Sequence, residues 1–164
     1  MSLKNVRVIV PVLLAAVALP QVAIAATASS TLTVNALVLN ICSVAPATLS
    51  FGNVTGSGDT DATASILVTC TLNTPYAVAL DQGANGSTVT TRQMKATLGT
   101  DLLGYSLYRD SGRTQNWGTT AGTDTVDGTG SGLTQTLTVY GRVPASLASP
   151  SGTYSDTVNI TVNY

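Results

Sequence analysis

The sequence predicts an all-β protein that folds as an antiparallel two-sheet sandwich. Threonine, serine, glycine and asparagine are abundant, whereas charged residues make up only 9% of the chain. Short segments of alternating apolar and polar residues recur with turn residues between them, which is typical of such sandwiches. The final segment, 156–164, alternates without interruption and therefore predicts a half-buried strand at the very end of the chain.

The first residues have the features of an export signal. Two basic residues precede an apolar run over 8–19, and Ala23-Ile24-Ala25 has the small-residue form of a cleavage site. We expect cleavage between Ala25 and Ala26, with a retained N-terminal anchor as the alternative. The apolar run is too short to span a bilayer comfortably. The expected organisation is a signal peptide at 1–25, an N-terminal extension at 26–40 and a domain at 41–164.

The charge balance and the missing residue types exclude several functions. The seven basic and eight acidic residues give a net charge of −1, and cleavage would remove two basic residues but no acidic one. This balance does not favour binding to nucleic acid. The chain has no histidine, so the usual general base and any Ser–His or Cys–His nucleophile are missing. We expect a protein that is not an enzyme and that needs no cofactor or metal.

Two cysteines, Cys42 and Cys70, remain after cleavage. In an exported chain they most simply form one disulfide. Closing the loop between them would stabilise the fold by roughly 3–4 kcal/mol in the chain-entropy model. A metal site or a redox dithiol is disfavoured, because there is no histidine and the spacing is not C-x-x-C.

Between the cleavage site and Cys42, a segment with a strand pattern occupies the position of a mobile tail. The even-numbered residues Leu32, Val34, Ala36 and Val38 are apolar and would share one face of a strand. From Leu37 onwards the odd-numbered residues are apolar as well. The change of face predicts two consecutive strand segments with different burial, or one strand that changes neighbours.

The rest of the chain predicts a series of short strands. Residues 65–72 are apolar on both parities, as in a strand buried on both faces. Residues 110–132 are rich in glycine and predict a long excursion, with at most a short strand at 115–118. The other strands are expected at 48–51, 76–81, 92–98 (a strand or a turn), 102–109, 133–143 and 156–164.

The aromatic side chains suggest two roles. Most lie in predicted strands, where packing in the core is the expected role. Trp117 lies in the glycine-rich excursion and leaves a sugar-binding platform as a third, weaker hypothesis.

An ordered set of motifs extends from about Leu37 to Tyr164. It consists of Cys42, Leu49-Ser50-Phe51-Gly52, Ile66-Leu67-Val68-Thr69-Cys70, Tyr76, Leu80-Asp81-x-Gly83, Arg92-x-Met94, Leu103-x-Tyr105-x-Leu107-Tyr108, Trp117-Gly118, Tyr140-Gly141-Arg142-Val143 and Gly152-x-Tyr154-x-Asp156. This set resembles the spore coat protein U domain family, whose members include secreted coat proteins and subunits of archaic chaperone–usher pili.

The resemblance implies an incomplete immunoglobulin-like sandwich that lacks its last strand. A periplasmic chaperone would lend a strand during assembly, and the N-terminal extension of the next subunit would replace it. The implied donor segment is Thr31 to Val38, and burying its three large side chains would contribute roughly 5–9 kcal/mol before ordering costs. The implied donor residues are Leu32, Val34, Ala36 and Val38, and the implied acceptor residues are Val158, Ile160, Val162 and Tyr164.

The function implied is that of a structural subunit of an extracellular pilus that supports adhesion and biofilm formation. Such a subunit would pass through the periplasm, and its partners would be a periplasmic pilus chaperone, an outer-membrane usher and neighbouring subunits. A head-to-tail contact of this kind does not close, so it forms filaments. The alternative is a secreted coat or surface-matrix protein whose extension inserts into its own groove.

Overall fold

The computed structural model describes residues 25–146 and 148–164. The predicted signal peptide lies outside these residues except for Ala25, which like Ala26 is exposed and outside regular secondary structure. Residues 37–164 form one compact unit, and residues 25–36 contain no strand or helix. Within the described ranges, no helix is long and apolar enough to cross a membrane.

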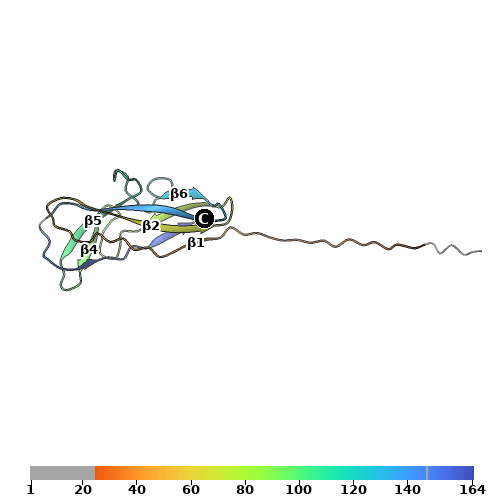
Figure 1. Cartoon of the computed structure of the whole chain (residues 1–164), viewed down its shortest axis with the longest axis horizontal. Helices are drawn as coiled ribbons and strands as arrows, with labels where there is room; N and C mark the ends of the chain where they lie inside the picture. The colour runs from red at the N-terminus through yellow and green to blue at the C-terminus, as the bar shows by residue number, and fades with distance from the viewer. Residues whose placement is uncertain (1–24, 147) are drawn as a thin grey trace, which may run out of the picture. The chain divides into compact units, whose positions relative to one another are not determined.

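The described residues form two antiparallel sheets, which confirms the predicted all-β sandwich (Figure 1). The larger sheet has the strand order β1-β2-β7-β5-β4-β8, and the smaller one has the order β6-β3-β9. The strands are β1 (Cys42–Val44), β2 (Thr60–Cys70), β3 (Pro75–Leu80), β4 (Arg92–Ala96), β5 (Leu102–Tyr108), β6 (Val126–Thr129), β7 (Thr134–Val143), β8 (Tyr154–Ser155) and β9 (Ile160–Asn163).

The long pair β2 and β7 forms the centre of the larger sheet, in a register that joins Thr60 to Val143 and Thr69 to Thr134. The prediction that residues 65–72 are buried on both faces is wrong. Within β2, Ile66, Val68 and Cys70 are buried and Leu67 is exposed, while Leu72 lies beyond the end of the strand and is exposed. The strand therefore alternates like the others, because only one face of the larger sheet is covered by the smaller sheet.

The core lies between the two sheets and contains side chains from most of the strands. Tyr105 and Leu107 on β5 point into it, as their shared parity predicts, and Val78 and Leu80 on β3 face them from the smaller sheet. The other buried members are Ile66, Val68, Cys70, Tyr76, Leu103, Trp117, Val139 and Val143.

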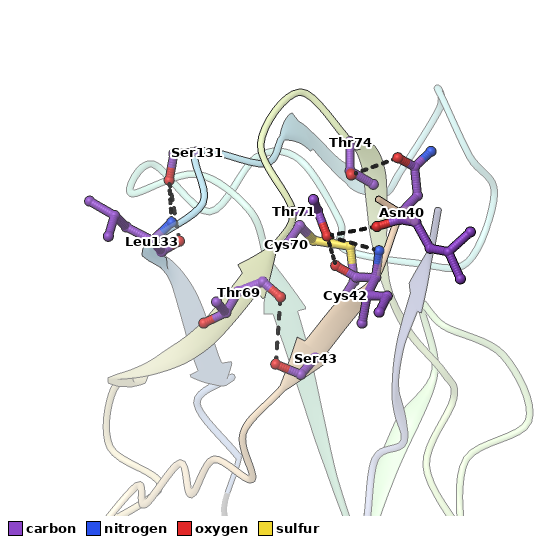
Figure 2. Close-up of a disulfide and its surroundings, with 11 residues drawn as sticks. Asn40, Cys42, Ser43, Thr69, Cys70, Thr71, Thr74, Ser131 and Leu133 are labelled. Carbon is purple, nitrogen blue, oxygen red and sulfur yellow. Dashed lines mark hydrogen bonds between the residues drawn. A yellow bond between two sulfur atoms is a disulfide. The ribbon is translucent and has the colours of Figure 1, made fainter. Parts of the chain in front are cut away.

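The predicted disulfide is present and joins β1 to β2 (Figure 2). Cys42 pairs with Cys70 across the ladder, and the two residues are 28 positions apart in sequence. Hydrogen bonds of Thr71 hold the residues before Cys42 to the residue after β2. The Thr71 N–H donates to the Ile41 carbonyl at 2.9 Å, and its hydroxyl donates to the Leu39 carbonyl at 3.2 Å. Together these bonds fix residues 39–44 to the end of β2.

Two expectations about the middle of the chain are wrong. Residues 48–51 form no strand, although Leu49 and Phe51 do pack against the core. The glycine-rich segment 110–132 contains β6, which was not predicted because its sequence, VDGT, has only one apolar residue besides glycine. Residues 115–118 form no strand but only a single β-bridge between Tyr108 and Asn116. Next to it, the backbone N–H of Trp117 donates to the Leu107 carbonyl at 2.9 Å.

Trp117 is fully buried, with its indole N–H donating to the Val78 carbonyl at 2.8 Å. A sugar-binding platform needs an exposed ring, so this hypothesis is wrong. The glycine-rich loop carries the ring into the core and does not display it at the surface.

The terminal segment is extended, but it is not the single uninterrupted strand that the alternation predicts. Of the predicted residues 156–164, only Ile160–Asn163 are a strand, β9, which lies at the edge of the smaller sheet beside β3. Residues 156–159 cross to it from β8, which lies at the edge of the larger sheet beside β4. Alternation continues through the crossing, with Val158, Ile160 and Val162 half-buried and Thr157, Asn159 and Thr161 exposed.

Candidate functional site

One side of the sandwich is open, because neither sheet edge there has a further strand. β1 forms the edge of the larger sheet, β9 forms the edge of the smaller sheet, and the two strands lie close to each other. After β1 the chain continues as the irregular segment 45–58, so beyond the contact between β1 and β9 the two edges are no longer joined.

A cavity of about 340 Å³ lies between the irregular segment and the terminal segment and reaches the core. Side chains of both sheets form its floor, including Ile66, Leu80 and Leu107. Its rims are the irregular segment on one side and the terminal segment on the other. The remaining lining residues are Ala47, Thr48, Leu49, Phe51, Ala64, Met94, Tyr105, Val139, Tyr154, Ser155, Asp156, Val158 and Ile160.

A second hollow of about 680 Å³ adjoins the first and shares Leu49, Phe51, Met94 and Tyr154 with it. It is lined further by residues 50–56 and 149–153, so the opening continues toward the loops that precede β2 and β8. We call the two hollows together the open groove.

The terminal segment presents unpaired backbone groups to the open groove. The carbonyls of Thr157 and Asn159 accept hydrogen bonds from Ala84 and Asp81 at 3.0 and 3.2 Å, so the odd-numbered residues pair with the chain around β3. In an antiparallel strand the N–H and C=O groups of alternate residues point to opposite edges. The backbone groups of Val158, Ile160 and Val162 therefore point to the free edge, where an added strand would bond.

The opposite rim is held by side chains alone. Within the described part of the chain, residues 46–58 make no hydrogen bond from backbone to backbone. Leu49, Phe51 and Val54 are half-buried and pack against the core. Leu49 and Phe51 lie against Gly141 of β7, where a β-carbon would come within 2.9 Å of each side chain. The absence of a side chain at Gly141 thus lets this rim lie close to the larger sheet.

Two aspartates fix the terminal rim in place. The Asp81 carboxylate accepts hydrogen bonds from the Asn159 N–H at 2.9 Å, the Asn159 amide at 2.6 Å and the Gly83 N–H at 2.9 Å. Burial alone would raise the pKa of Asp81, but the hydrogen bonds from Gly83 and Asn159 outweigh it and hold the pKa below its ordinary value.

Asp156, at the start of the crossing segment 156–159, binds the loop after β3 that also holds Gly83. Its carboxylate accepts hydrogen bonds from Ala84 N–H at 3.0 Å, Asn85 Nδ2 at 2.9 Å and the Tyr105 hydroxyl at 2.6 Å. Burial and the bond to Asp156 raise the pKa of Tyr105 far above its ordinary value, so the phenol stays a donor. Gly83 has no β-carbon, and one there would collide with the Asp156 carboxylate.

A buried arginine supports this rim from behind. Arg92 is 1% exposed, and its guanidinium donates to the carbonyls of Leu80 at 2.9 Å, Asp81 at 2.8 Å, Trp117 at 2.7 Å and Val89 at 2.6 Å. Burial lowers its pKa, and the nearby Tyr105 and Asp81 oppose that shift. Arginine remains protonated in proteins, so Arg92 is a charged donor that joins the end of β3 to two loops.

The structure places the predicted acceptor residues unevenly. Val158 and Ile160 line the cavity, Val162 packs against the core beside it, and Tyr164 is 60% exposed and is not among the lining residues. Of the predicted donor residues, Leu32, Val34 and Val38 are exposed, as is Ala36.

Sequence reasoning did not assign several residues that form the site. Leu49, Phe51, Met94 and Tyr154 line both hollows, and Arg92 and Asp81 fix the rim. All six belong to motifs that carried the resemblance, which was the available signal. Their roles depend on which loops meet, and a sequence pattern does not show that. Among the described residues, no group of three or more His, Cys, Asp or Glu side chains could hold a metal ion.

The family model of the spore coat protein U domain matches residues 28–161, which include the whole open groove. The chain belongs to this family. The family membership that the sequence motifs predicted is therefore confirmed. The incomplete sandwich is the fold that the resemblance implied. A curated relative, Protein U of Myxococcus xanthus, is 40% identical over 156 residues, which cover 85% of this chain and 87% of the relative.

A solved structure shares the fold. It is a chain in the crystal structure of the CsuC–CsuE chaperone–tip adhesion subunit pre-assembly complex from the archaic chaperone-usher Csu pili of Acinetobacter baumannii. The TM-score is 0.58 and the sequence identity is 25%, and the match covers 77% of this chain. This chain spans 40% of the length of that one.

Proposed function

We propose that this protein is a structural subunit of an extracellular chaperone–usher pilus and that it polymerises by donor-strand exchange. One observation carries the proposal: an apolar cavity lies open beside an unpaired strand edge, and the same chain carries an exposed segment with the pattern of the strand that would fill it. The similarity to a chain of a pilus pre-assembly complex supports the same interpretation.

The proposed exchange follows from how strands recognise an open edge. The donor backbone bonds to the free N–H and C=O groups of Val158, Ile160 and Val162, and alternate donor side chains enter the groove. Leu32, Val34 and Val38 supply three large apolar side chains, and Ala36 supplies a small one. Because the 340 Å³ cavity is lined largely by apolar side chains, filling it removes apolar surface of both partners from water.

The proposed life cycle has three partners. The signal peptide directs export to the periplasm, a chaperone there covers the open groove with a strand of its own, and an outer-membrane usher exchanges that strand for the extension of a neighbouring subunit. The finished fibre lies on the cell surface, where it supports adhesion and biofilm formation. The role is structural and not enzymatic.

The match to Protein U over most of both chains favours a second candidate function. In this alternative the protein is a secreted coat or surface-matrix component, and its extension fills its own groove. For this, residues 39–41 would have to release their hydrogen bonds to Thr71 and reverse the chain before β1. The two candidates differ in which molecule supplies the strand.

The test is polymerisation in cells that express the chaperone and the usher. We compare the full protein, a deletion of residues 31–38, and a Val34→Asp variant that places a charge at the centre of the donor. Thr33→Asp is the matched control, because Thr33 has the opposite parity and its side chain would face solvent. Material sheared from the cell surface is run in SDS with and without boiling.

The proposal predicts an unboiled ladder from the full protein and from Thr33→Asp that collapses to one band after boiling. The deletion and Val34→Asp should lose the ladder while still binding the chaperone. A ladder from the deletion variant would show that the donor assignment is wrong. A single band in both lanes from the full protein would instead favour the self-filled coat protein.

A further inference from the structure

The end of the domain that carries the disulfide exposes four large apolar side chains. Leu39 is 60% exposed, Ile41 59%, Leu72 62% and Leu133 73%. They lie on three segments that are joined by hydrogen bonds, as when Gly132 N–H donates to the Cys70 carbonyl at 3.2 Å. Figure 2 shows Leu133, Thr71 and Asn40 around the disulfide at this end. We call the four residues the apolar cap.

No charged residue lies in the segments that form the apolar cap, 37–44, 71–75 and 130–134. The polar side chains there, Asn40, Ser43, Thr71, Asn73, Thr74, Ser131 and Thr134, are uncharged, and Thr71 and Thr74 are bonded within the cap segments. Thr71 bonds to residues 39 and 41, and the Thr74 hydroxyl donates to the Asn40 side chain at 3.2 Å. A partner that covers this end therefore removes apolar surface from water without desolvating a charge.

The proposed donor segment ends directly before the apolar cap. Val38 is its last donor residue, and the next residue, Leu39, is already held to the domain through its carbonyl. Consecutive α-carbons are about 3.8 Å apart, so no slack lies between the donor and the domain. A folded neighbour that binds Val38 in its groove must therefore contact the end of this domain where the donor segment joins it.

We infer that the apolar cap is a subunit–subunit contact, and that a second copy of this chain, the one that accepts the donor strand, covers it. This inference rests on the proposed function and adds to it. Strand exchange alone would leave successive domains free to rotate, whereas the buried cap fixes each domain against the next. The fibre is then a rod with direct contact between domains and not a chain of domains on flexible linkers.

The test measures access to the cap before and after polymerisation. Leu133→Cys and, separately, Leu72→Cys place a thiol in the cap, and Thr63→Cys places one on the exposed face of β2. Thr63 is seven residues before Cys70, roughly 23 Å away along the strand. Each thiol is labelled with a maleimide in fibres and in monomers that lack residues 31–38.

We expect labelling at positions 133 and 72 to be about tenfold or more slower in the fibre than in the monomer, because a covered thiol reacts only through local opening. Labelling at position 63 should be equal in both. Equal rates at 133 and 72 in fibres that still give the unboiled ladder would overturn this inference and leave the proposed function intact. If the parent protein gives no ladder, the proposed function fails and this inference fails with it.

Discussion

The two rims of the open groove have opposite constructions. The terminal rim, residues 154–163, is fixed by β8, β9, two half-buried carboxylates and a buried arginine. The facing rim, residues 46–58, makes no backbone hydrogen bond within the described chain and is held by three apolar side chains. One rim is thus a pre-organised template for an added strand, and the other is free to adjust to the side chains that enter.

This difference would suit the proposed strand exchange, in which the site accepts different strands in turn. Backbone hydrogen bonds need accurate positions, so the edge that supplies them should be rigid. Side-chain packing tolerates small shifts, so the opposite rim can close over occupants of different shapes.

The largest expected effect comes from removing the support of the rigid rim. Arg92→Met leaves four carbonyls without their donor, and we expect the free energy of unfolding to fall by about 3–5 kcal/mol. Arg109→Met is the control, because Arg109 donates one bond, to the Thr125 carbonyl, and should cost about 1 kcal/mol. Urea unfolding followed by the fluorescence of Trp117 measures both. Equal losses would show that Arg92 does not hold the rim.

A smaller effect is expected from displacing the adjustable rim. Gly141→Ala adds a methyl group 2.9 Å from Leu49 and Phe51, and we expect a loss of about 1–3 kcal/mol. Gly104→Ala on β5 is the matched control, because a β-carbon there meets nothing within 4 Å, and its effect should be within about 0.5 kcal/mol. A loss well above 3 kcal/mol at position 141 would contradict the adjustable rim, since it would mean that residues 46–58 cannot move away.

The smallest expected effect is a dependence on pH. The folded pKa of Asp81 is below its unfolded value of about 3.9, so its contribution to stability is complete above that pH. The contribution is lost as the pH falls through the lower folded pKa. Melting temperatures between pH 6 and 3 should therefore fall less steeply for Asp81→Asn than for the parent protein. The same slope of melting temperature against pH in both proteins would show that ionisation of Asp81 does not contribute to the stability of the fold.

Much of this arrangement follows from local patterns in the sequence. The alternation in β5, in β7 and in the terminal segment predicts which side chains face the core, and the two cysteines predict the disulfide. These features depend on the two-residue period of strands and on export, both of which are local in sequence.

The features that were missed depend on distant residues. Residues 48–51 look like a strand, but their backbone bonds to no other backbone group, and they pack through side chains alone. The predicted strand at 156–164 is interrupted because residues 156–159 cross between the sheets, and alternation is the same with or without the interruption. The burial of Trp117 depends on a loop that turns inward, which its glycines permit but do not predict.

The central claim is that the open groove accepts the extension of this chain. The most direct test adds a synthetic peptide of residues 29–40 to protein that lacks residues 31–38 and records the melting temperature. The account predicts a saturable rise of several degrees, since a ligand at about 100 times its Kd stabilises by about 2.7 kcal/mol, and no rise with the Val34→Asp peptide. No rise with either peptide, or the same rise with both, would contradict it.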